Sequence, residues 1–269
     1  MDERRPFLLP ALLALGAIAT LTPFAWMFAT SVTSDTNLTT PTLVPSDPTL
    51  DSYRTLFATL PFWRIVLNSF WIALVATALQ LLTSAMGAYG FARLHFRGKQ
   101  FIFFLYLATL MVPMQVLVVP LFIEMRTLHL IDTYAAILIP TIASAFGVFL
   151  LRQAIEQVPH ELDDAARVDG AGHLRIFLSV ILPLIRPSIA TFAVFAFMAS
   201  WNSFLWPLVV IRSPELMTLP VGLANLQGQY TTDWNVLMAG SVLSVVPIVV
   251  FYLIAQRHVI QGVALSGLK

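Results

Sequence analysis

Long, almost uninterrupted runs of apolar residues recur along this 269-residue chain, with shorter polar stretches between them. A helix that crosses a bilayer needs about 20 mostly apolar residues, whereas strands of a membrane barrel alternate at every second position over about 10 residues. Because the runs are continuously apolar, they predict helices. Six of them come close to the required length: Leu9–Val32, Phe70–Arg93, Phe101–Glu124, Tyr134–Leu151, Ile189–Ile211 and Val236–Gln256. The pattern therefore predicts an all-α, polytopic membrane protein with six transmembrane helices.

The composition agrees with a lipid environment. Hydrophobic residues make up 58% of the chain and charged residues 11%, with a mean hydropathy of +0.82, whereas a soluble domain carries about 25% charged residues. The net charge of +1 gives no support to nucleic-acid binding. The chain has no cysteine, which excludes disulfides and thiolate metal sites. The first apolar run is too long for a signal-peptide core of about 7–15 residues, so we interpret it as a transmembrane helix.

The basic residues predict the orientation of these helices. With the N-terminus inside, the inner segments hold 11 of the 15 Lys and Arg residues and the outer segments hold the other four, Arg54, Arg64, Arg126 and Arg212. An excess of basic residues marks the cytoplasmic side, so both termini are expected there. On the outer side, Tyr53, Leu56, Phe57 and Leu60 share one helical face after Asp51, a candidate N-cap. They predict a short interfacial helix that ends at Pro61, with Trp63 as an aromatic anchor.

The inner loop of residues 152–188 has the length of a helical hairpin. Pro159 and the acids after it suit a helix start, and Gly170 can take the left-handed conformation that closes a helix. A second short helix is expected to run until Pro183. The first helix presents Leu162, Ala165, Ala166 and Asp169 on one face, and the second presents Leu174, Phe177 and Ile181. This elbow could transmit a push from a soluble partner, or it could merely cap the bundle.

The same loop carries a family motif. Asp164-Ala165-Ala166, three residues, Gly170, nine residues and then Val180-Ile181-Leu182-Pro183 resembles the EAA loop of ABC-importer permeases, in which Glu-Ala-Ala and Ile-x-Leu-Pro stand at this spacing. Asp164 replaces the usual Glu and Val180 the usual Ile, and both replacements keep the chemistry. Further pieces make the chain similar to the second permease of maltose-type carbohydrate transporters: Asn68-Ser69, Ala88-Tyr89 through Arg93, Phe96, Gly98 and Lys99, Asp169-Gly170-Ala171, Trp201-Asn202, and Gln256-Arg257 leading to Gly262 and Gly267-Leu268-Lys269.

The resemblance implies a type I ABC importer permease fold over residues 1–269, as a single transmembrane domain, in a bacterial cytoplasmic membrane. It implies a heterodimer with a second permease, two copies of a cytoplasmic ATPase that binds ATP and Mg, and an extracytoplasmic substrate-binding protein. The chain itself would need no cofactor. The residues that the motif assigns to ATPase coupling are Asp164, Ala165, Ala166, Asp169, Gly170, Ala171, Leu182 and Pro183. The tail near Gly262–Lys269 would reach toward the ATPase dimer.

Polar residues inside the predicted spans are candidates for a translocation pathway. Trp201, Asn202, Ser203 and Trp206 lie in the fifth span, where an unpaired amide in lipid would cost several kcal/mol. Asn202 therefore faces either a polar cavity or a helix–helix hydrogen bond. Gln80 and Ser84 in the second span leave the same two alternatives open. Kinks at Pro113, Gln115, Pro120 and Pro140 could serve as hinges or simply fix the packing.

Catalysis has little support in the sequence. The spans hold almost no ionisable group, which argues against a proton-coupled secondary carrier. There is no GxxxxGK[ST] phosphate loop and no nucleophile or acid/base cluster, which argues against an ATPase or a membrane-embedded enzyme. The five histidines lie outside the spans without metal-ligand spacing and are expected at solvated or interfacial positions: His95, His129, His160, His173 and His258. The hypothesis that remains is an importer permease for a carbohydrate, with a non-sugar solute as the alternative.

Overall fold

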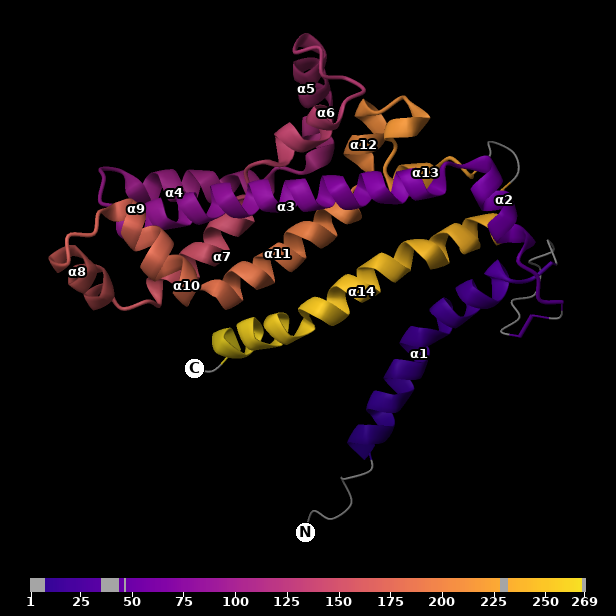
Figure 1. Ribbon diagram of the computed structural model, residues 1–269, viewed down its shortest axis with the longest axis horizontal. Helices are drawn as coiled ribbons and strands as arrows, with labels where there is room; N and C mark the ends of the chain where they lie inside the picture. The colour runs from indigo at the N-terminus through magenta and orange to yellow at the C-terminus, as the bar shows by residue number, and fades with distance from the viewer. Residues whose placement is uncertain (1–7, 35–43, 46, 228–231, 268–269) are drawn as a thin grey trace. The chain divides into compact units, whose positions relative to one another are not determined.

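The structure is a computed structural model that describes residues 8–34, 44–45, 47–227 and 232–267, with side chains described from Pro10 to Val250 and at Leu253 (Figure 1). Among these residues the regular elements are all helices and no strand occurs, only the isolated bridges Thr33–Pro48 and Gln227–Thr232. The all-α prediction is confirmed. The described chain divides into two compact units: unit 1 contains Met1–Arg64 and Leu219–Ile248, and unit 2 contains Ile65–Thr218 and Val249–Lys269.

The elements follow one another along the chain with short connections. The first part holds α1 (Leu8–Ser31), α2 (Asp51–Thr59), α3 (Phe62–Arg93), α4 (Lys99–Ala108), η1 (Thr109–Met111), α5 (Met114–Thr127), α6 (Tyr134–Leu138), η2 (Ile139–Thr141) and α7 (Ala145–Glu156). The second part holds α8 (His160–Val168), α9 (His173–Ile176), the π-helical turn η3 (Phe177–Ile181), α10 (Leu182–Leu184), α11 (Arg186–Trp201), α12 (Leu205–Val210), η4 (Pro214–Leu216), α13 (Leu219–Ala224) and α14 (Trp234–Gly267).

Unit 1 contains the predicted short outer helix. α2 buries Leu56, while Phe57 of the same helix is exposed and stacks on Trp63 at a centroid distance of 5.9 Å. The N-cap is Leu50 rather than Asp51, which occupies the first helical position and pairs with Arg54. An acid at that position still suits the positive end of the helix dipole, so the prediction of the helix holds while the assigned cap is wrong by one residue.

Only some of the predicted spans are single straight helices. Among the described residues, Pro10–Ser31 and α3 are long and apolar enough to cross a bilayer by themselves. Three further candidates are bent pairs, so the count of spans is two, or up to five if each pair is one span. A further apolar segment, Trp234–Val250, is shorter than these candidates. The predicted six transmembrane helices are therefore not confirmed.

Backbone breaks explain why continuous apolar runs became bent helices. The chain turns by 99° between Lys99–Met111 and Met114–Thr127, next to Pro113, and by 44° between Tyr134–Thr141 and Ala145–Glu156, after Pro140. Proline lacks the backbone N–H that continues a helix. The predicted kinks at Pro113 and Pro140 are thus present. The predicted span Ile189–Ile211 is also interrupted, since α11 ends at Trp201 and α12 begins at Leu205.

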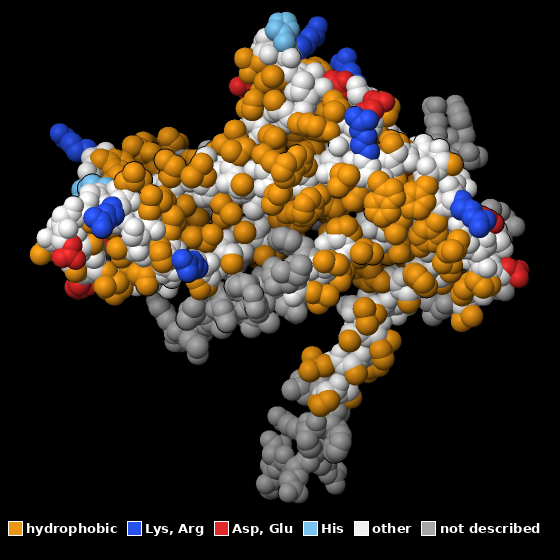
Figure 2. All heavy atoms as spheres, viewed as in Figure 1, with side chains coloured by type: hydrophobic (Ala, Val, Ile, Leu, Met, Phe, Trp, Pro, Cys, Tyr) orange, Lys and Arg blue, Asp and Glu red, His pale blue; other side chains and the backbone are white. Residues whose placement is uncertain are grey.

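Two apolar clusters among the described residues of unit 2 hold α3 against its neighbours. One joins α3 to α7, α9, η3 and α11 through buried side chains that include Tyr89, Leu151, Ile155, Ile181 and Phe192. The other joins α3 to α5, α6 and α12 and includes Ile72, Met125, Ile137, Trp206 and Val210. In Figure 1 the α8–α10 end and the α5–α6 end of this unit lie well apart. Figure 2 shows hydrophobic side chains between these ends and charged side chains gathered at them, the distribution expected of a unit that sits in a bilayer.

Candidate functional site

The predicted cytoplasmic elbow consists of α8 followed by the segment from α9 through η3 to α10. α8 begins after Pro159, carries Glu161 and Asp163 in its first turn and Arg167 in its last, and so complements the helix dipole at both ends. Gly170 has φ +78°, in the left-handed region that the sequence predicted. The amide of Gly170 donates to Arg167 O and that of Ala171 to Ala166 O, both at 2.9 Å, which is the Schellman pattern of helix closure.

The second helix of the elbow does not end at Pro183, so that part of the prediction is wrong. Helical backbone continues through Pro183 to Leu184, and the chain then turns by 80° at Ile185 into α11. The five residues before α10 form a π-helical turn, Phe177–Ile181. This wider turn already gives up the regular i→i−4 pattern just before the proline, whose missing N–H and ring would otherwise break it.

The eight residues that the motif assigns to coupling fall into two groups. Ala166, Ala171 and Leu182 pack against the cluster that surrounds Ile155 and Ile181, and Pro183 is half-buried. Asp164, Ala165, Asp169 and Gly170 are exposed. The first group packs the elbow against the rest of unit 2, and the second is exposed together with apolar neighbours. Val168 is 88% exposed, Leu174 71% and Leu162 42%, so bare apolar side chains lie next to charged ones on this surface.

Asp164, the acid of the motif, is available at this surface. Its carboxylate pairs with Arg167 Nη1 at 3.0 Å, and the two side chains are 68% and 47% exposed. Exposed pairs one helical turn apart contribute less than about 1 kcal/mol, so this pair is easily exchanged for a pair with another molecule.

Asp163, by contrast, turns inward and is the acid that the sequence analysis did not single out. It is 1% exposed and lies 2.7 Å (Oδ2) from Nε of Arg93, which is 3% exposed and ends α3. The contact is close but poorly aligned as a hydrogen bond, so the two groups interact as an ion pair. The position of Arg93 gave no signal for this pairing, because an arginine at the end of a span can equally extend its charge to the membrane interface.

The Arg93 guanidinium also binds two other groups at the start of α8. Nη2 donates to Val158 O at 2.6 Å, and Nη1 lies 3.1 Å from His160 Nε2. Arginine can only donate, so His160 accepts with Nε2 and carries its proton on Nδ1. One turn earlier in α3, Tyr89 Oη lies 3.2 Å from Nδ1 of His173, the first residue of α9. The end of α3 therefore holds both short helices of the elbow, and His160 and His173 are exposed residues with defined partners.

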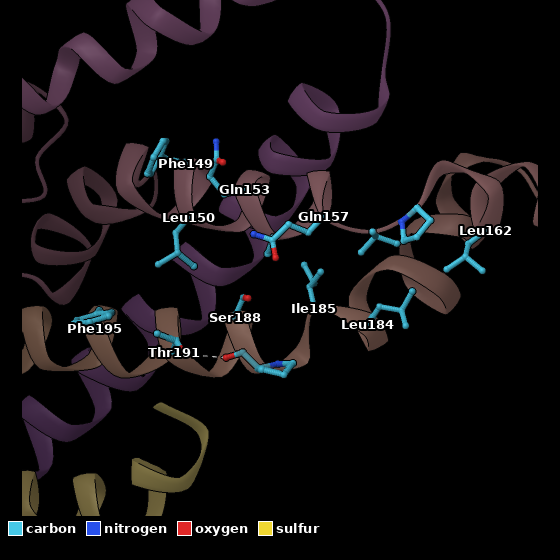
Figure 3. A pocket seen from close by; sticks show the side chains of 14 residues that line it. Phe149, Leu150, Gln153, Gln157, Leu162, Leu184, Ile185, Ser188, Thr191 and Phe195 are labelled. Carbon is cyan, nitrogen blue, oxygen red and sulfur yellow. Dashed lines mark hydrogen bonds between the residues drawn. The ribbon is translucent and has the colours of Figure 1, made fainter. Parts of the chain in front are cut away.

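A groove opens beside the elbow, between α7 and α11 (Figure 3). Its volume is about 510 Å³, and its walls are mostly apolar, with Gln153, Gln157, Ser188 and Thr191 as the polar lining residues. Figure 3 shows Gln157 and Ile185 facing each other across it, and Thr191 bonded to the carbonyl of Pro187 in its own helix. The groove could receive an elongated, partly polar molecule or a neighbouring helix.

The candidate pathway residues lie at the break between α11 and α12. Trp201 and Trp206 are 2% and 3% exposed; Trp201 stacks on Phe197, and Trp206 Nε1 donates to Ala136 O at 2.8 Å. Asn202 is exposed and donates to Met198 O of its own helix at 2.8 Å. Ser203 is half-buried beside it. The two indoles are thus core side chains of unit 2, and the exposed amide stands at the interrupted helix end.

At the other end of α3, Asn68 forms a second set of contacts. Its Nδ2 donates to Glu215 O at 2.8 Å and to Met217 O at 3.0 Å, and its Oδ1 accepts from Tyr134 Oη at 2.8 Å. Nearby, Asp132 has φ 62° and accepts from the backbone amides of Arg212 and Ser213 and from the Ser213 hydroxyl. The loops before α6 and after α12 are joined through these side chains.

No group of three or more His, Asp or Glu residues that could hold a metal ion occurs in the described part of the chain. The tail Gly262–Lys269, which the family resemblance directs toward an ATPase, lies outside the residues whose side chains are described.

Comparison with known proteins adds independent evidence. Residues 80–265 match the family described as "Binding-protein-dependent transport system inner membrane component". The arabinooligosaccharides transport system permease protein AraQ of Halalkalibacterium halodurans is 43% identical over 84% of this chain and 81% of that protein. The lactose transport system permease protein LacG of Rhizobium radiobacter is 34% identical over 94% and 92%.

A solved structure agrees with the fold. A chain of a bacterial ABC transporter involved in the import of the acidic polysaccharide alginate superposes with a TM-score of 0.81 at 26% identity, covering 92% of this chain and 94% of that one. The helical architecture, the extent of the family match and the identity to curated permeases agree with one another. This chain belongs to the family of inner membrane components of binding-protein-dependent transport systems.

Proposed function

We propose that this chain is one permease subunit of an ATP-driven importer that carries a carbohydrate into the bacterial cytoplasm by alternating access. The observation that carries the proposal is the elbow, which exposes apolar and charged side chains and is held by the Arg93–Asp163 pair to the end of α3, in a chain that belongs to a binding-protein-dependent transport family. The elbow lies on the cytoplasmic side in this proposal, with both termini, as the distribution of basic residues favours.

The exposed face of the elbow is the proposed seat of a separate ATPase subunit. Asp164 and Asp169 supply negative charge, and Ala165 leaves room for close approach of another chain. Gly170 closes α8. The less exposed residues of the motif pack the elbow against the rest of unit 2: Ala166, Ala171, Leu182 and Pro183. ATP and Mg belong to that ATPase in this proposal, since the sequence lacks a phosphate-binding loop. The assembly would contain two ATPase copies and a second permease.

A carbohydrate is the proposed substrate because AraQ and LacG carry sugar names and the solved relative belongs to an alginate importer. Asn202 and Ser203, at the break between α11 and α12, are the residues of this chain proposed to line the pathway, with Trp201 and Trp206 shaping that break from the core. An importer for a non-sugar solute is the alternative that a substrate panel would reveal.

Reconstitution tests the proposal. The chain is placed in proteoliposomes with its second permease, the ATPase and the binding protein, and uptake of radiolabelled oligosaccharides is measured with and without ATP. Uptake that requires ATP, the ATPase and the binding protein is expected. Uptake by the chain alone, in liposomes without the ATPase, would refute the coupling role and favour a secondary carrier.

A further inference from the structure

The helix α3 connects the elbow with the loops at the opposite end of unit 2. Arg93 and Tyr89 bind α8 and α9 at one end, and Asn68 binds Glu215, Met217 and Tyr134 at the other. Asn68 and Arg93 are 25 positions apart, about 38 Å along a helix that rises 1.5 Å per residue. One helix therefore has specific polar contacts with both ends of the unit.

α3 is also the stiffest candidate connection. Among the described candidate spans of unit 2, only α3 has no break, while the Lys99–Thr127, Tyr134–Glu156 and His173–Trp201 segments are bent by 99°, 44° and 80°. α3 contains no proline. The elbow is covalently continuous with α7 and α11, but the 80° bend at Ile185 lies between the elbow and α11. A displacement of the elbow is absorbed at a bend more readily than along an unbroken helix.

The contacts of Arg93 leave the elbow little freedom to move relative to the end of α3. The guanidinium has three partners within two turns of chain, Val158 O, His160 Nε2 and Asp163 Oδ2. Because both charges of the Arg93–Asp163 pair are almost fully buried, separating them would leave an uncompensated charge inside the protein. The elbow and the end of α3 must therefore move together.

We propose that α3 acts as a connecting rod between the elbow and the outer loops, with Arg93, Asp163 and Asn68 as positioning residues that fix its two ends. This inference rests on the proposed function, because the signal that travels along α3 is the one between the binding protein outside and the ATPase inside. The proposal assigns these residues to the coupling of binding-protein docking to ATP hydrolysis. It assigns them neither to substrate contact nor to ATPase binding.

The experiment uses the reconstituted complex and measures how strongly the substrate-loaded binding protein stimulates ATP hydrolysis, together with the solute imported per ATP. The variants are Asp163→Asn, Asn68→Ala and their double mutant. Each single variant is expected to retain the ATPase on co-purification while its stimulation falls by about tenfold, within the usual range for coupling between distant sites. The double variant should be no worse than the more defective single one, because both substitutions interrupt the same connection.

Matched controls separate this effect from nonspecific damage. Arg97→Gln removes an exposed charge four residues beyond Arg93, and Thr127→Ala removes an exposed hydroxyl that bonds only its own helix at Glu124 O. Both should behave as wild type. Asp163→Glu, which keeps the charge, should recover part of the stimulation, whereas Arg93→Lys should not, because a single ammonium cannot reach all three partners.

Three results would overturn the proposal. Full stimulation in either single variant would show that α3 is not needed for the signal, and effects that multiply in the double variant would show that the two ends act independently. Failure of Asp163→Asn, Asp163→Glu and Arg93→Lys alike to insert or to retain the ATPase would assign the pair to folding alone. Absence of ATP-driven import by the wild-type complex would instead refute the proposed function, so the two failures are distinguishable.

Discussion

Gly147, in the first turns of α7, has no room for a side chain. A Cβ built on it would meet Phe192 Cζ and Ser84 Oγ far inside contact distance and would lie 2.6 Å from Phe192 Cε1. Carbon atoms normally approach to about 3.5–4.0 Å, so Phe192 would have to move by about 1 Å. Phe192 is 1% exposed and belongs to the cluster that anchors the elbow, which leaves it no free space.

The substitution Gly147→Ala is therefore expected to destabilise unit 2. Overpacking a filled core costs about 1–3 kcal/mol, from which the ordinary helical gain of Ala over Gly, about 0.5–1 kcal/mol, is subtracted. Gly90 in α3 is the matched control, because a Cβ there meets nothing within 4 Å. Gly90→Ala should show only the gain. The two variants should thus differ by about 1–3 kcal/mol, or roughly 3–10 °C in melting temperature.

Thermal unfolding of the purified protein in detergent, followed by circular dichroism at the helical band, measures this difference. Phe192→Leu in the Gly147→Ala background should recover part of the loss, because it removes the two ring atoms that clash and leaves only Ser84 Oγ. Equal melting temperatures for the Gly147→Ala and Gly90→Ala variants would refute the reasoning, since the packing between α7 and α11 would then be looser than described.

Three further predictions concern separate parts of unit 2. At Gly170, with φ +78° and open space around it, Val should weaken ATPase co-purification while Asn, which tolerates the left-handed region, should largely preserve it; equal loss in both variants would make bulk rather than backbone conformation decisive. At Asp132, hydrogen bonds from the side chain and amide of Ser213 and the amide of Arg212 hold the pKa below its ordinary value of 3.8. The stability they provide is therefore complete above that value and is lost as pH falls through the lower folded pKa. Melting curves down to about pH 3 should fall less for Asp132→Asn than for wild type, and parallel curves would contradict the assignment. Trp206→Phe removes the hydrogen bond to Ala136 O and should lower stability by about 1–3 kcal/mol in the same melting assay, with an unchanged melting temperature as the contrary result.

Local chemistry made much of the elbow predictable. Pro159 at the start of α8 and Gly170 at its end act through their own backbone preferences, which operate wherever the residues occur. The all-α class followed from the continuous apolar runs. A backbone in lipid must satisfy its own hydrogen bonds, and a single apolar segment does so as a helix. The motif spacing then marked the same loop as the candidate coupling segment.

The direction in which each acid of α8 points could not be predicted in this way. Asp163 and Asp164 are adjacent and chemically identical, yet one is buried on Arg93 and the other is exposed. The choice depends on the rotation of α8 against α3, and thus on contacts between residues 70 positions apart in the sequence. The contacts of Asn68 with residues 215 and 217 join positions that are even farther apart in the sequence.

The size of the bends could likewise not be predicted from the number of apolar residues in each run. The sequence by itself determined that the chain is helical, lies in a membrane and carries an elbow closed by Gly170, because composition and local backbone preference act over a few residues. Only the tertiary structure decided how far the chain turns near Pro113 and Pro140, that it also turns at Ile185, and that α3 alone in unit 2 remains an unbroken candidate span among the described residues. The same packing paired Asp163 with Arg93, because a buried charge is stable only where folding delivers its partner.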